Sequence, residues 1–139
     1  MNVLVIDAQG GGVGKQLITS LKASFPALSV TAVGTNSAAT GAMLRAGADQ
    51  AATGENAVLV GCRTADVIIG PIGIVIADSL LGEITPAMAQ AVGRSRAKRI
   101  LIPFDNCGNI IVGMEQIPTR ERIERAVKEL GRLMEETVP

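Results

Sequence analysis

One stretch near the amino terminus decides the fold: Val3-Leu4-Val5-Ile6-Asp7-Ala8-Gln9-Gly10-Gly11-Gly12-Val13-Gly14-Lys15. Its first four residues are apolar and mostly β-branched, which is typical of a strand buried on both faces of a sheet. Beyond the glycines, apolar residues recur at helical spacing until Pro26, at Val13, Leu17, Ile18, Leu21 and Phe25. A buried strand, a glycine-containing turn and a helix form the first part of a βαβ unit.

The same alternation continues along the chain. It predicts strands over 29–33, 50–52, 66–69 and 99–103, and helices over 37–46, 55–60, 85–95 and from Thr119, which is expected to cap the last helix. Asn109–Val112 is interpreted as a further edge strand or hairpin, whereas 70–78 fits a loop, a helix or a strand. Apolar strands alternating with helices predict an α/β fold: one domain over 1–139, a three-layer Rossmann-like sandwich with a mostly parallel sheet of five to six strands.

Composition excludes several function classes. The 139 residues contain thirteen basic and thirteen acidic side chains, so there is no overall basic footprint for nucleic acid. There is no His, which excludes a His-based triad or a His-ligated metal, and two cysteines cannot complete a structural zinc site. We therefore expect neither a metal site nor a nucleic-acid partner.

The sequence also carries no targeting or membrane signal. Met1-Asn2 lacks a basic segment, and the nearly uncharged run Val67–Ala77 is too short to span a bilayer. A cytoplasmic protein without a membrane partner is the expectation. A mean hydropathy of +0.36 gives more apolar surface than one small core hides, which predicts a homodimer with contacts at Ile68–Ala77 and the helix from Thr85.

The glycines of the first stretch predict a phosphate site. Glycine permits tight turns and close backbone approach to a phosphate, and the following helix offers free N–H groups. A dinucleotide motif fits at Gly10 and Gly12, but its third glycine position holds Lys15. A turn without any ligand is the alternative. The predicted binding residues here are Gly10, Gly11, Gly12, Val13, Gly14 and Lys15.

The same stretch has a second, local resemblance. Gly11-Gly12-Val13-Gly14-Lys15 resembles the phosphate loop of ParA/MinD-type ATPases. That family's signature lysine position is Gly10 here, and the magnesium-binding Ser or Thr is replaced by Gln16. A nucleotide is therefore expected to bind without hydrolysis of ATP.

Two more segments are expected at the same edge of the sheet. After the second strand stand Thr35, Asn36 and Ser37, with no carboxylate for a ribose hydroxyl. Together with Arg45 these polar groups would suit a 2′-phosphate, which favours NADP over NAD; simple helix capping by Asn36 or Ser37 is the alternative. The last predicted binding segment follows the fourth strand and comprises Gly70, Pro71, Ile72 and Gly73.

Candidates for catalysis are few. Without any Tyr, a Tyr-Lys dyad is excluded. Asp78 or Glu83 could transfer a proton or bind a cation, although capping and solvation also explain them. Cys107 lies in a polar turn and lacks a His partner that would activate it.

Four motifs together resemble a known family: Asp7–Gly12, Gly34–Ser37, Gly70–Val75 and Gly82–Pro86. The resemblance is to small bacterial proteins grouped as a domain of unknown function, and it covers nearly the whole chain. It implies a small bacterial protein and lends no activity. The sequence thus predicts a nucleotide- or dinucleotide-binding protein with a sensory or regulatory role. The alternatives are a small cofactor-dependent enzyme using Asp78 or Glu83, and a homo-oligomeric interaction protein whose loop is empty.

Overall fold

The computed structural model describes residues 1–104 and 108–137. Five strands alternate with five α-helices and one short 3₁₀ helix. In chain order these are β1 (Asn2–Asp7), α1 (Gly12–Ser24), β2 (Ser29–Gly34), α2 (Ser37–Arg45), β3 (Gln50–Thr53), α3 (Glu55–Thr64), β4 (Val67–Pro71), η1 (Ile72–Val75), α4 (Pro86–Arg94), β5 (Lys98–Ile102) and α5 (Thr119–Glu136). The predicted α/β alternation is confirmed.

The strands form one parallel sheet in the order β3-β2-β1-β4-β5. Val5 in the central strand lies beside Ala32 of β2 on one side and Ile69 of β4 on the other. The chain first moves outward from β1 to β3 and then crosses over to β4 and β5. The direction reverses between β1 and β4, which is where open α/β sheets leave a crevice at the carboxyl ends of their strands.

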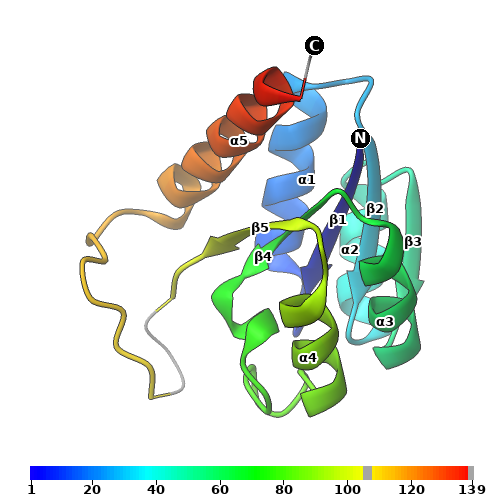
Figure 1. Ribbon diagram of the computed structural model, residues 1–139, viewed down its shortest axis with the longest axis vertical. Helices are drawn as coiled ribbons and strands as arrows, with labels where there is room; N and C mark the ends of the chain where they lie inside the picture. Colours follow the sequence, from blue (N-terminus) through cyan, green and yellow to red (C-terminus); the bar gives the residue numbers. More distant parts are fainter. Residues whose placement is uncertain (105–107, 138–139) are drawn as a thin grey trace.

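Helices cover both faces of the sheet (Figure 1). Alternate residues of β1 enter two separate cores, since successive side chains of a strand point to opposite faces. Val3 and Val5 pack with side chains of α1, α2 and α5, whereas Leu4 and Ile6 pack with α3 and α4. The predicted three-layer sandwich is therefore confirmed.

The interpretation of Asn109–Val112 as an edge strand or hairpin is wrong. No strand is formed there, and residues 108–118 extend away from the sheet before α5 begins (Figure 1). Gly108 and Gly113 have φ of 77° and 84°, so the chain bends on each side of the segment. The cap of α5 also differs from the prediction, because Pro118 is the N-cap and Thr119 is the first helical residue.

The prediction that Ile68–Ala77 forms a contact surface is also wrong for most of the segment, because most of its residues are buried. Every residue of β4 is buried, and so are Gly73 and Ile74 of η1. The exposed apolar side chains lie elsewhere, since Leu81 is 88% exposed, Ile110 93% and Val112 95%. Of the helices in the described part of the chain, none is long and apolar enough to cross a membrane.

Candidate functional site

A cleft of about 260 Å³ lies at the reversal point, between the carboxyl ends of β1 and β4 and the start of α1. Among the residues predicted to bind a ligand, Gly10–Val13 and Pro71 line it. The described residues that line it are Asp7, Ala8, Gln9, Gly10, Gly11, Gly12, Val13, Pro71, Leu80 and Phe104. The structure thus brings the first and the last predicted segments together.

Two of the glycines after β1 are required by the fold. Gly11 has a φ of 72°, and a Cβ there would come within 2.8 Å of Ala39 Cα in α2. A Cβ on Gly14 would lie 2.5 Å from Met43 Sδ and 3.0 Å from Asp7 Cβ. These glycines allow α1 to approach α2 and the end of β1, so packing and backbone conformation explain them.

Gly10 and Gly12 are different. Neither has a positive φ, and a Cβ at either position would meet no other atom within 4 Å. Their backbone N–H groups donate no hydrogen bond within residues 1–104 and 108–137. Nothing in the described structure therefore requires glycine at these positions, although both line the cleft.

Asp7 ends β1 and is the carboxylate of the cleft. It is 5% exposed, and its two carboxylate oxygens accept the N–H groups of Ala8 at 2.8 Å and Gly14 at 2.7 Å. This carboxylate therefore compensates the positive end of the α1 dipole. Burial raises its pKa, the backbone hydrogen bonds lower it, and nearby Glu83 raises it again, with a net upward shift. The sequence placed Asp7 in a motif but predicted no binding or catalytic role for it.

The side chain of Glu83, from the loop before α4, lies beside the residues that follow β2. Its Oε1 accepts the Thr35 hydroxyl and the Asn36 amide, both at 2.7 Å, and the carboxylate also accepts Gln9 N–H at 3.1 Å. Burial raises the pKa of Glu83, but the hydrogen bonds from Thr35, Asn36 and Gln9 outweigh it and hold the pKa below its ordinary value. A carboxylate therefore stands at the strand end where the local sequence shows none.

This arrangement corrects the prediction of a 2′-phosphate site. The donors of Thr35 and Asn36 are bound to Glu83, and Asn36 Oδ1 caps α2 by accepting Ala39 N–H at 2.9 Å. Arg45 belongs to the last turn of α2, at the far end of the helix. Asn36 caps α2, as the capping alternative predicts, and the donors of Thr35 and Asn36 are engaged within the protein.

A constrained loop holds Glu83 in place. Asp78, Leu80 and Leu81 have backbone φ angles of 65°, 55° and 58°, which residues with a Cβ rarely adopt. The hydroxyl of Ser79 donates to the carbonyl of Gly73, and Leu80 packs into the core on the α3 and α4 face. The backbone of this loop is therefore strained, and the loop places the Glu83 carboxylate beside the carboxyl ends of β1 and β2.

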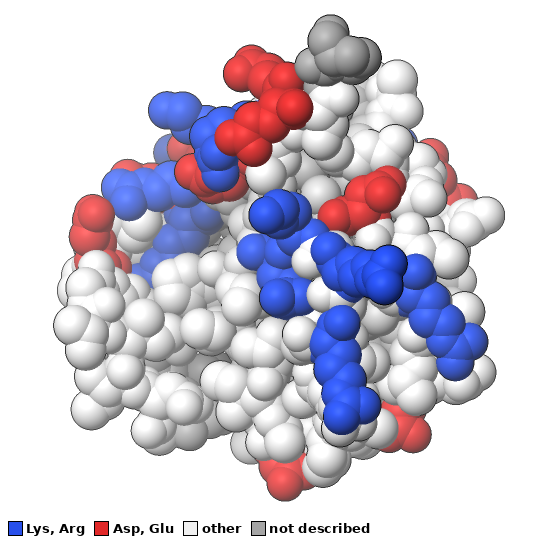
Figure 2. Space-filling view, viewed as in Figure 1, with Lys and Arg blue, Asp and Glu red and all other residues white. Residues whose placement is uncertain are grey.

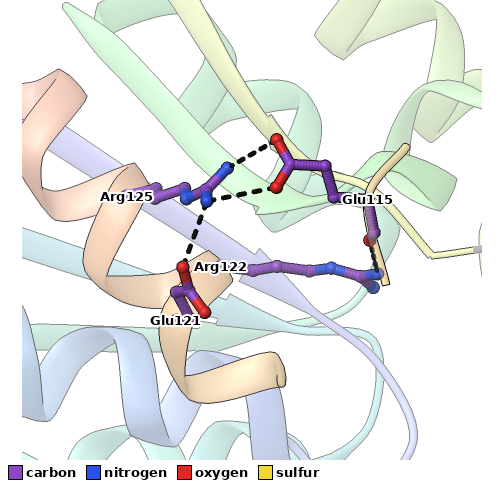
Figure 3. A network of polar contacts seen from close by, with 4 residues as sticks. All are labelled: Glu115, Glu121, Arg122 and Arg125. Carbon is purple, nitrogen blue, oxygen red and sulfur yellow. Dashed lines mark hydrogen bonds and ion pairs between the residues drawn. The ribbon is translucent and has the colours of Figure 1, made fainter. Parts of the chain in front are cut away.

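Phe104, the aromatic residue of the cleft, is contacted by Arg122 of α5, whose polar network with Glu115, Glu121 and Arg125 is drawn in Figure 3. The guanidinium of Arg122 lies 5.7 Å from the ring centroid, and it donates to the carbonyls of Pro103 at 2.9 Å and Glu115 at 3.0 Å. Arg125 holds the Glu115 carboxylate at 3.3 Å and that of Glu121 at 3.1 Å. Arg122 therefore joins both ends of the segment between β5 and α5. The sequence did not predict Phe104 as a site residue; the available signal was its position just after β5.

The other predicted site residues lie outside the cleft lining. Lys15 is exposed, and its N–H donates to Gly11 O at 2.8 Å; Ser37 is the exposed first residue of α2. Gly70 and Gly73 are packed, since a Cβ would come within 2.5 Å of Ile6 O or 3.0 Å of Ser79 Oγ. Ile72 begins η1.

Two further expectations concern a thiol and a metal. Cys107 falls outside the described residues. Within 1–104 and 108–137, no cluster of three acidic or thiol side chains could hold a metal ion.

Fold and cleft together define a small parallel α/β protein with a crevice at the strand-order reversal. The chain belongs to the family described as Domain of unknown function (DUF3842), whose model matches residues 2–135 and confirms the family resemblance. None of the curated proteins matches.

The chain is similar to solved structures at low sequence identity. An FMN-dependent cysteine decarboxylase, TvaF from thioviridamide biosynthesis, has a TM-score of 0.50 and 14% identity over 94% of this chain and 86% of that chain. A dodecameric FMN-dependent UbiX-like decarboxylase from Escherichia coli O157:H7 has a TM-score of 0.47 and 19% identity over 94% and 76%.

Proposed function

We propose that this protein binds the phosphate of a nucleotide-type cofactor at the cleft between β1 and β4. The observation that carries the proposal is the pair Gly10 and Gly12: both line the cleft, have free N–H groups, and have no packing or conformational reason to be glycine. Without a Cβ these positions let a phosphate reach the backbone and accept the N–H groups of Gly10 and Gly12; because the Asp7 carboxylate already compensates the α1 dipole, these N–H groups would hold the phosphate.

The shape and charge of the site favour some cofactors over others. A volume of about 260 Å³ holds a phosphate with a sugar-sized group, so the rest of the cofactor would lie outside. The ring of Phe104 offers an apolar face for a flat ring system. Glu83 at the end of β2 would accept a sugar hydroxyl and repel a 2′-phosphate, which argues against NADP.

A mononucleotide with a flat ring is therefore the first cofactor to test. Flavin mononucleotide fits this description, and the match to TvaF supports the choice at the level of the fold. When bound, a flavin supplies electron-accepting chemistry that no side chain of this protein offers. NAD is the second cofactor to test.

A second candidate function is a cofactor-dependent enzyme in which Asp7 carries the proton. Asp7 lines the cleft and burial raises its pKa, a combination suited to an acid–base group. Glu83 suits this role less well, because its hydrogen bonds hold the pKa low. Asp78 is exposed and is not part of the described lining.

The binding proposal is tested by titrating the full chain with flavin mononucleotide and following flavin fluorescence and the melting temperature. Gly12→Val should abolish binding, because its branched Cβ would occupy the approach of the phosphate. Gly93→Val is the matched control, since Gly93 is also helical and its Cβ position is also open. If FMN, NAD and ATP all leave the wild-type melting temperature unchanged at millimolar concentration, the glycines only form a turn. The interaction-protein alternative would then hold.

We also propose that the protein forms a homodimer through its exposed apolar loops. Leu81, Ile110 and Val112 are the most exposed large apolar side chains among the described residues. The lower left of the view in Figure 2 has few charged side chains, and a surface of that kind suits a contact between subunits. Light scattering should give twice the monomer mass, and Ile110→Asp with Val112→Asp should return the monomer. A wild-type monomer at high micromolar concentration would contradict the proposal.

A further inference from the structure

A second hollow, of about 400 Å³, lies at the opposite edge of the sheet from the cleft. Arg63 from α3, Arg94 from α4 and Arg96 from the following turn surround it. Its apolar lining comes from Leu59, Cys62 and Ala91. Figure 2 shows Lys and Arg side chains grouped in the middle and right of the view, with an acidic side chain bordering the group. Three cations from separate elements thus converge on one recess.

The fold does not use these three guanidinium groups. Within the described residues, Arg63, Arg94 and Arg96 make no ion pair and no side-chain hydrogen bond. Arg99 already satisfies the end of α4 by donating to the carbonyl of Ser95 at 2.8 Å. On α5, by contrast, Arg120, Arg125 and Arg132 all pair with glutamates.

No carboxylate of the described residues pairs with these three arginines. The carboxylate of Asp66, at the same edge, accepts Asn2 N–H at 2.6 Å, and Lys98 at the start of β5 adds a further cation. Burial raises the pKa of the Cys62 thiol to about 11, so this wall of the hollow stays neutral. A ligand here therefore meets three forked cationic donors and an apolar surface.

We propose that this hollow binds a small organic phosphate: the arginines hold the phosphate and the apolar wall holds a short carbon chain. A guanidinium group binds carboxylate and phosphate alike through pairs of hydrogen bonds, but three guanidinium groups outnumber the two oxygens of a carboxylate and suit the additional oxygens of a phosphate. Nucleic acid fits less well, because Phe25 and Phe104, the two aromatic residues of the chain, are not part of the hollow and cannot stack bases.

The test uses the full chain, inorganic phosphate and butyl phosphate, with backbone amide shifts in NMR as the readout. Saturable shifts are expected at 59–64 and 91–96, and butyl phosphate should bind more tightly than inorganic phosphate. Shifts confined to 8–15 would assign the phosphate to the cleft instead, which keeps this proposal separate from the cofactor proposal.

A matched pair of triple variants removes the effect of net charge. Arg63→Gln with Arg94→Gln and Arg96→Gln should weaken binding of the phosphate roughly tenfold or more, because its charge-assisted hydrogen bonds to the three guanidinium groups are lost. Arg120→Gln with Lys128→Gln and Arg132→Gln removes the same charge from α5 and should change affinity little. Equal weakening by the two triples, or no saturation at millimolar phosphate, would overturn the proposal.

Discussion

The two edges of the sheet handle charge in opposite ways. At the carboxyl edge, the Asp7 and Glu83 carboxylates are tied to backbone and side-chain donors. At the amino edge, Arg63, Arg94 and Arg96 have no protein partner in the described structure. In a parallel α/β fold all helices begin at one edge and end at the other, so acids suit the first edge and cations the second. The dipoles favour both signs, but within the described structure only the first set of charges makes hydrogen bonds.

The largest expected effect separates glycines that the fold needs from those it does not. Gly11→Ala should destabilise the protein by about 2–4 kcal/mol, because the new Cβ meets the α2 backbone at a positive φ. Gly12→Ala should change stability by less than about 0.5 kcal/mol, since its Cβ position is open. Chemical denaturation of both variants measures this difference. Similar losses in the two would mean that Gly12 also serves packing.

The next effect concerns Glu83, whose charge stabilises the carboxyl edge. Glu83→Gln should cost roughly 1–2 kcal/mol at neutral pH, because charge-assisted hydrogen bonds become neutral ones. The pKa of Glu83 is lowered by folding, so this stabilisation is present above its ordinary value of 4.5 and is lost as pH falls through the folded-state pKa. Denaturation at several pH values checks this.

The difference between wild type and Glu83→Gln should therefore shrink in acid. Glu135→Gln is the control, because Glu135 is an exposed side chain of α5. A difference that stays constant from neutral pH into acid would show that the shape of the side chain, and not its charge, fixes the loop.

The features that the sequence predicted correctly are those fixed by interactions between residues close together in the chain. The apolar run of β1 and the helical spacing of α1 are local signals, and both elements were predicted. The same holds for the cap at Asn36, whose partner lies three residues away. The cleft was predicted only in part, since Gly10–Val13 and Pro71 line it as expected.

The missed features depend on contacts between distant residues. Glu83 reaches Asn36 across 47 positions and Phe104 is held by Arg122, so no local pattern reveals either contact. Asn109–Val112 shows the converse: its strand-like composition is real, but without a neighbouring strand in the sheet it forms none. Strand propensity is realised only through pairing.

A smaller effect links the two carboxylates of the carboxyl edge. Glu83 raises the pKa of Asp7, so Glu83→Gln should lower the pKa of Asp7 while burial still holds it above its ordinary value. Carbon-13 NMR titration of the carboxyl groups reads this directly. Asp49→Asn should leave the pKa of Asp7 unchanged, because Asp49 pairs with Lys22 elsewhere. An unchanged pKa in Glu83→Gln would show that the two carboxylates act independently.

The smallest effect tests the amino edge. Arg96 lies among cations without a carboxylate partner in the described structure, so Arg96→Gln should relieve repulsion and raise the melting temperature by about 1 °C at low ionic strength. Salt screens exposed charges, so the gain should vanish in molar salt. Arg132→Gln should have the opposite sign, because Arg132 pairs with Glu129 and Glu136. A melting temperature that falls in Arg96→Gln would mean that this arginine stabilises the fold, and the contrast between the two edges would then fail.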